Sequence, residues 1–203
     1  MVDKTAIQEL FHNYFTSGHH SPDELVEIQI GDAGEVNVYE VTPGAGILLA
    51  LPTPFPNGKL PVKFGVCNAS LLLNKCGLTS LEGSPPVVNG RFSASLNPLK
   101  DMTGGPIEVL RSVGFMQDFP VQSLAGFPNK VGRHLRIIYH KNLPLLRSLV
   151  CKGGVMLSST KHSHALLEQV EDIIAQYAGQ GRRAMFECQK ALEDAGFEGN
   201  ARW

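Results

Sequence analysis

Cysteine and histidine are the side chains of this sequence that could supply a nucleophile, a general base or a metal ligand. Cys67 and Cys151 are the candidate nucleophiles, and Cys67 borders a predicted helix N-terminus, which would lower the pKa of its thiol. The favoured interpretation of both is a buried core thiol. An enzyme with a Cys/His site and no local motif remains one of three functional hypotheses. Its histidine candidates are His134, His140, His162 and His164.

Two pairs of histidines lie close enough in the sequence to be considered as metal ligands. His162 and His164 would share one face of an extended segment, which suits a metal, but Ser163 between them is a plausible helix N-cap. No carboxylate or cysteine stands beside them to complete a ligand set. His19 and His20 are adjacent and diverge on any regular element. The sequence therefore predicts no metal and no cofactor.

Several motif-bearing enzyme families are excluded. The phosphate-binding GxxxxGK[ST] loop, the dinucleotide-binding GxGxxG, the GxSxG and HExxH motifs and the kinase signatures are all missing. An enzyme whose catalytic residues are dispersed along the chain would leave no such trace, because its site assembles only in the fold.

Charge is unevenly distributed although the formal net charge is only −1. Residues 1–58 hold eight acidic residues and one basic residue. Residues 119–167 hold no Asp or Glu and seven Lys or Arg, where an even spread would place about five acids. This segregation is the strongest functional signal in the sequence.

The strand predicted over 132–140 gives the basic segment a geometry. If Leu135, Ile137 and Tyr139 face the core, the alternate side chains face outward and form a basic strip. Such a strip could bind lipid head groups, nucleic-acid phosphates or an acidic protein face. The predicted anion-binding residues are Lys130, Arg133, His134, Arg136, His140 and Lys141.

Three interpretations of the charge map remain open. The acidic N-terminal region could pack beside the basic strand within one monomer, the strip could bind an anionic partner, or the two could meet in a homo-oligomer. The favoured function is a non-enzymatic binding or assembly protein, viral matrix-like or adaptor-like by analogy only. The remaining hypothesis is an accessory chaperone or cognate-partner protein that dimerises through its C-terminal helices.

Local patterns predict an α+β fold with a largely antiparallel sheet, an N-terminal helix and a C-terminal αα-hairpin. The N-terminal helix spans 4–16 with Asp3 as its N-cap, and a hairpin follows with its turn at 32–34. Apolar stripes over 166–177 and 185–195 predict the two C-terminal helices. Between the hairpin and the C-terminal helices, the patterns predict strands at 46–51, 61–66, 91–96, 132–140 and 155–159, and short helices at 69–76, 106–113 and 143–150.

The chain has 203 residues, 43% of them hydrophobic, which predicts a single globular domain over 1–203 with a flexible tail at 197–203. No internal repeat was recognised. The N-terminus lacks the pattern of a signal peptide, and the longest apolar run, 46–51, is far too short to cross a bilayer. These features predict a cytoplasmic or otherwise intracellular protein.

Overall fold

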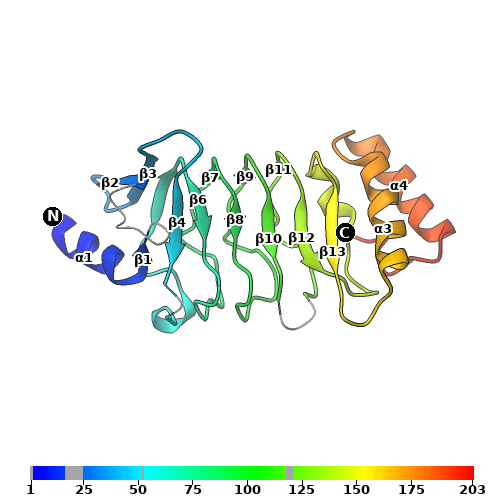
Figure 1. Cartoon of the computed structure of the whole chain (residues 1–203), viewed down its shortest axis with the longest axis horizontal. Helices are drawn as coiled ribbons and strands as arrows, with labels where there is room; N and C mark the ends of the chain where they lie inside the picture. Colours follow the sequence, from blue (N-terminus) through cyan, green and yellow to red (C-terminus); the bar gives the residue numbers. More distant parts are fainter. Residues whose placement is uncertain (1, 17–24, 52, 118–120) are drawn as a thin grey trace.

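The computed structural model describes residues 2–16, 25–51, 53–117 and 121–203. Within them the chain winds into a β-solenoid of about five turns, whose two mixed, mostly parallel sheets form two sides of an elongated body (Figure 1). A helix and a β-hairpin lie at one end of this body, and two further helices lie at the other.

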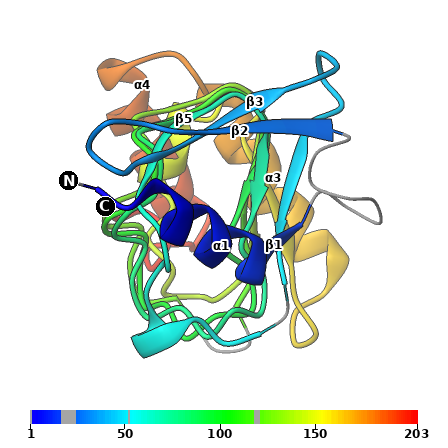
Figure 2. The same ribbon diagram turned by 90° about the vertical axis from the view of Figure 1, so that its left-hand side faces the viewer.

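The N-terminal elements form the first cap. In α1 (Lys4–Tyr14) the Asp3 carboxylate accepts a hydrogen bond from the Ala6 amide at 3.0 Å, which confirms the predicted N-cap. The predicted hairpin is also confirmed, since β2 (Val26–Ile30) pairs antiparallel with β3 (Val36–Glu40). Figure 2 shows α1 and this hairpin crossing the end of the solenoid.

Each turn of the solenoid contributes strands to both sheets. The seven-stranded sheet has the order β1 (Phe15–Thr16), β4 (Ile47–Ala50), β6 (Ser70–Leu72), β8 (Phe92–Ser93), β10 (Val113–Phe115), β12 (Leu135–Ile138) and β13 (Val155–Ser158). The six-stranded sheet has the order β11 (Lys130–Val131), β9 (Glu108–Val109), β7 (Val87–Val88), β5 (Phe64–Cys67), β3 and β2. A 3₁₀ turn, η1 (Pro56–Gly58), lies between β4 and β5.

The prediction of a largely antiparallel sheet is wrong. Among the described strands only β1–β4 and β2–β3 pair antiparallel, and the other pairs are parallel. The error has a physical cause. Alternation of apolar and polar residues shows that one face of a strand is buried, and this usually marks antiparallel sheets. In a solenoid each parallel strand also has one inner and one outer face, so the same alternation arises.

The solenoid is built on an internal repeat that the sequence analysis did not recognise. The paired inner residues Leu71, Phe92, Val113, Leu135 and Val155 follow one another at intervals of 20–22 residues. Over three turns the linking segment carries the pattern Leu/Met-x-Gly-x-Pro-x-x-Val. Its members are Leu81, Gly83, Pro85 and Val88; Met102, Gly104, Pro106 and Val109; and Leu124, Gly126, Pro128 and Val131.

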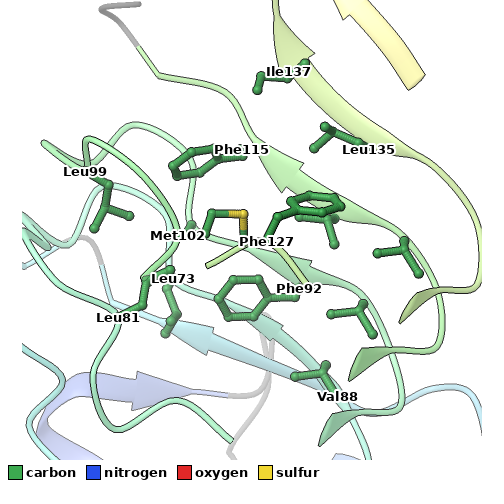
Figure 3. Close-up of a cluster of buried hydrophobic side chains, with 14 of the residues drawn as sticks. Leu73, Leu81, Val88, Phe92, Leu99, Met102, Phe115, Phe127, Leu135 and Ile137 are labelled. Carbon is green, nitrogen blue, oxygen red and sulfur yellow. The ribbon is translucent and has the colours of Figure 1, made fainter. Parts of the chain in front are cut away.

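The glycine of this pattern is required by the backbone. Gly83, Gly104 and Gly126 have φ angles of 95°, 83° and 71°, in the left-handed region that other residues rarely adopt. The leucine or methionine, the proline and the valine of each repeat are buried. Stacked turns thus bury one continuous core that no single turn could form alone (Figure 3).

Two predicted helices are strands in the structure. Residues 69–76 contain β6, and no helix follows Asn68, whose side-chain oxygen accepts a hydrogen bond from Asn89 Nδ2 at 2.9 Å. Residues 106–113 contain β9 and the start of β10. The strand expected at 46–51 is present as β4, but Leu48 is its only fully buried residue, so it is not covered on both faces.

The C-terminal helices form the second cap and confirm the predicted αα-hairpin. α3 (His164–Tyr177) begins at the Ser163 N-cap and packs on β13, on α4 (Arg182–Asp194) and on the short η2 (Leu146–Val150). The buried side chains of the pair are Leu167, Val170, Ile174, Ala184, Cys188 and Leu192. Among the described residues no helix is both long and apolar enough to cross a bilayer.

Residues 197–203, expected to form a flexible tail, are held against the solenoid. Asn200 is fully buried, and its side chain accepts a hydrogen bond from the Tyr139 hydroxyl at 3.0 Å and donates to the carbonyls of His140 and Leu143. The Asn200 carbonyl also accepts from the Leu145 amide at 3.0 Å. Local pattern could not anticipate this, because every partner lies more than fifty residues earlier in the chain.

Candidate anion-binding site

The outward-facing side chains of β12 hold the centre of the predicted basic strip. Leu135, Ile137 and Tyr139 are buried and Arg136 is exposed, so the expected alternation is confirmed. The chain, however, passes from the six-stranded to the seven-stranded sheet between β11 and β12, so the predicted strip lies on two different faces. Lys130 lies on the six-stranded sheet, where it forms an ion pair with Glu108.

At the other end of β12 the strip is interrupted as well. The ring nitrogen Nδ1 of His140 accepts a hydrogen bond from the Asn142 amide at 3.2 Å, and Lys141 follows His140 after the strand has ended. Of the six predicted residues, the structure therefore brings Arg133, His134 and Arg136 together and leaves Lys130, His140 and Lys141 apart from them.

A hollow of about 380 Å³ opens on the outer face of the seven-stranded sheet beside these residues. We call it the arginine hollow. Arg91 and Arg136 stand on its two sides with His134, and the smaller residues Ser93, Ser112 and Gly114 line it between them. Its remaining lining residues are Leu72, Asn74, Phe92, Val113 and Met156.

The register of three strands explains the hollow. Gly114 of β10 pairs with Ser93 of β8 on one side and with Arg136 of β12 on the other. Ser112 precedes β10 at the level of Arg91, since its carbonyl accepts the Phe92 amide at 3.1 Å. Glycine and serine on the middle strand thus leave a gap between arginines that belong to the two neighbouring turns.

The floor of the hollow is ordered by hydrogen bonds. The Ser93 hydroxyl donates to Asn74 Oδ1 at 2.7 Å and lies 3.1 Å from the Ser95 hydroxyl. A Cβ atom on Gly114 would come within 2.8 Å of Ser93 Oγ, so a larger residue at this position would displace the Ser93 hydroxyl. The floor is therefore polar and closely fitted.

The electrostatics of the hollow are positive. Burial lowers the pKa of His134, and the nearby charges of Arg136, Arg133 and Arg91 lower it further. Among the described residues, no acidic side chain lines the hollow and no ion pair involves its arginines. Both effects favour the neutral form of His134, so the arginines carry the positive charge of the hollow.

Sequence reasoning missed Arg91, which precedes Arg136 by two turns of the solenoid. The repeat could have found it, because register at 20–22-residue intervals places the residues of β8, β10 and β12 side by side. The local pattern places Arg91 only at the start of the strand predicted over 91–96. The contribution of Arg91 to the arginine hollow depends on the residues of β12, which lie two turns further along the solenoid.

The candidate nucleophiles are unsuited to catalysis. All four cysteines are buried and unpaired. Burial raises the pKa of the Cys67 thiol to about 11 and that of Cys151 to about 12, and no helix begins beside Cys67 to oppose this shift. Both thiols are protonated at neutral pH.

The other histidine candidates have local partners. His162 Nδ1 lies 2.9 Å from the Ser159 hydroxyl, and His164 lies 3.2 Å from Glu168 one turn along α3. His19 and His20 lie outside the described residues. Within the described part of the chain, no three His, Cys, Asp or Glu side chains gather as a metal site would require.

Charge also follows the architecture. Residues 1–58, which include the first cap, carry a formal charge of −7, and residues 162–203, the second cap, carry −3. Residues 59–161, which form most of the solenoid body, carry thirteen Lys or Arg and four Asp or Glu, or +9. In the six-stranded sheet β9, β7 and β5 separate β11 from the acidic hairpin. In the seven-stranded sheet β6, β8 and β10 separate β12 from β4, so among the described residues the N-terminal strands do not lie beside the strand that holds the centre of the basic strip.

Comparisons with known proteins give no relatives for this chain: no family model, no curated protein and no solved structure matches it.

Proposed function

We propose that this protein is a non-enzymatic binding protein whose seven-stranded sheet binds an anionic partner in the arginine hollow. The observation that carries the proposal is the convergence of Arg91, His134 and Arg136 around a gap whose lining, in the described part of the chain, contains no acidic side chain. Its volume of about 380 Å³ lies within the usual range for small-ligand sites, about 300–1,000 Å³.

A phosphate-type group suits this geometry. Guanidinium groups bind phosphate oxygens through paired hydrogen bonds, and arginines on both sides of the gap can reach one anion above Gly114. His134 adds a proton donor when it is charged. The small residues of β10 keep the place of the anion clear.

Two alternatives have less support. Dimerisation through the C-terminal helices needs an exposed apolar face, yet Leu166, Ile173 and Met185 are partly buried and pack against the core of the same chain. A Cys/His enzyme needs an accessible thiolate, whereas the cysteines are buried and protonated. The unpaired thiols fit a reducing compartment, and we propose an intracellular location on that basis.

Self-association remains a second proposal because of the charge distribution. Both caps are acidic and the body between them is basic. Like charges oppose end-to-end stacking of solenoids, so an acidic cap of one copy would dock on the basic flank of another.

The binding proposal is tested by titrating inorganic phosphate into the ¹⁵N-labelled protein and following backbone amides by NMR. We expect saturable shifts at Ser93 and Gly114 in the wild type and their loss in Arg91→Gln/Arg136→Gln. Lys190→Gln, at an exposed residue of α4, is the matched control and should bind like the wild type. Shifts that are absent, or that survive the double variant while its thermal midpoint is unchanged, would overturn the proposal.

A further inference from the structure

A second set of cations continues from the arginine hollow along one corner of the solenoid. We call Arg111, Arg133 and Lys152 the corner row; all three are exposed. The Arg133 amide donates to the Arg111 carbonyl at 3.0 Å, and the Gly153 amide donates to the Arg133 carbonyl at 2.9 Å. These bonds place Arg111 and Arg133 at the same position of neighbouring turns, with Lys152 beside the equivalent position of the next.

The corner row runs parallel to the solenoid axis. Neighbouring turns are about 4.8 Å apart, the spacing of hydrogen-bonded strands, so the row spans about 10 Å. It is continuous with the hollow, because Arg133 directly precedes His134 and contributes to the positive field that lowers the pKa of that histidine. A chain of negative charges could therefore occupy both.

The surroundings of the row leave most of its charge uncompensated. Asn89, Leu110 and Gly132, the preceding residues on successive turns, carry no charge. Glu40 lines a hollow together with Arg111, and its carboxylate accepts a hydrogen bond from the Gly44 amide at 2.7 Å. Glu40 is the one acidic residue among the described residues that line this second hollow, and it lies at the end of the row away from Lys152.

We propose that the anionic partner is a linear inorganic polyphosphate that lies along the corner row with one phosphate in the arginine hollow. This inference rests on the proposed function. Directly linked phosphates can fill the hollow and contact Arg111 and Arg133 without any spacer group. A nucleic acid would also have to place sugars and bases here.

The side chains near the row argue against single-stranded nucleic acid. Such strands bind by stacking successive bases on aromatic rings. Phe186 and Trp203, the aromatic residues among the large hydrophobic side chains exposed in the described structure, belong to the C-terminal part of the chain. Tyr39, beside Arg111, is half-buried. A bare phosphate chain needs no stacking surface.

The test compares orthophosphate, long-chain polyphosphate, single-stranded DNA and duplex DNA by calorimetry at equal phosphate concentration and fixed salt. We expect polyphosphate to bind at least about tenfold more tightly per phosphate than orthophosphate, because linked groups bind with a high effective concentration. Both DNA probes should bind more weakly than polyphosphate. Tighter binding of either DNA would overturn the inference in favour of a nucleic-acid partner.

Matched variants separate this inference from the proposed function. Arg111→Gln/Lys152→Gln should remove most of the advantage of polyphosphate and leave orthophosphate binding unchanged, and Lys100→Gln/Lys190→Gln should alter neither. Affinity independent of chain length, or unaffected by the corner-row variant, overturns the inference alone. Orthophosphate binding that is absent, or insensitive to Arg91→Gln/Arg136→Gln, overturns the proposed function.

Discussion

Arg111 and Arg133 are twenty-two residues apart in the sequence but one hydrogen-bonded step apart in the fold, since the Arg133 amide donates to the Arg111 carbonyl at 3.0 Å. The same winding brings Arg91 and Arg136 to the two sides of Gly114. The solenoid thus turns cations scattered through the sequence into a compact surface. Stability and the proposed anion binding consequently depend on the same repeat.

Replacement of one repeat leucine should destabilise the whole solenoid. Leu81 is fully buried in the core, and Leu81→Ala removes its packing and leaves a cavity, so we expect a loss of about 2–5 kcal/mol in the free energy of unfolding. Chemical denaturation measures this. Ile107→Ala, at a side chain that is 58% exposed, is the control and should change stability by no more than about 0.5 kcal/mol. Equal losses of stability in Leu81→Ala and Ile107→Ala would contradict the burial of the repeat leucine in the common core.

The amide of Asn97 should contribute to stability by linking neighbouring turns. Its oxygen accepts from the amides of Cys76 and Leu78, and its nitrogen donates to the carbonyls of Leu73 and Ala94. Asn97→Ala leaves these buried groups unpaired. Each group that stays without a hydrogen-bond partner lowers the free energy of unfolding by about 1–3 kcal/mol. We expect urea denaturation to show a loss of at least about 2 kcal/mol. Exposed Asn129→Ala should have little effect, and a neutral Asn97→Ala would refute the role.

Protonation of His134 should strengthen anion binding. Burial and three arginines hold the pKa of His134 below its usual 6.5, and a bound anion would raise it. Binding then takes up a proton, so affinity should rise as the pH falls through the His134 pKa. Sulfate is the suitable probe because it does not titrate in this range. Calorimetry between about pH 8 and pH 5.5 should show tighter binding at the acidic end.

The same titration of His134→Gln identifies the responsible group. The arginines around His134 stay charged throughout, so this variant should bind sulfate with an affinity that hardly varies with pH. A pH dependence that persists in the variant would assign the proton to another residue.

Electrostatic self-association should depend on salt. If an acidic cap of one copy docks on the basic body of another, light scattering should give a mass above the monomer's 22.0 kDa at low salt that falls as salt rises. Arg111→Glu/Arg133→Glu should lower the mass at low salt. A dimer insensitive to salt would indicate an apolar interface, and a monomer at both salts would remove self-association under those conditions.

The elements that could be predicted from the sequence are those stabilised by neighbouring residues. The N-cap at Asp3, the cap at Ser163 and the hairpin turn at 32–34 act within a few residues, and all three are confirmed. The local patterns predict helices where the structure has the short strands β6 and β9. Strands of two or three residues have little intrinsic preference, and the turns above and below determine their conformation.

The candidate site could be predicted only in part for the same reason. Alternation along β12 correctly exposed Arg136 and buried Leu135 and Ile137, because side-chain direction along a strand is local. Arg91 and the gap at Gly114 depend on the register between turns. The repeated glycine and proline of the linking segments mark equivalent positions of successive turns and so indicate this register. The segments differ at most other positions, however, and the spacing between them varies.

The most direct test of the central claim is an anomalous difference map from crystals containing tungstate, a heavy-atom oxyanion with the charge and shape of phosphate. We predict a peak on the outer face of the seven-stranded sheet above Gly114, within hydrogen-bonding reach of both Arg91 and Arg136, and no such peak in Arg91→Gln/Arg136→Gln. Tungstate bound only elsewhere, or absent from a hollow left open by the crystal packing, would contradict the assignment of this surface as the anion-binding site.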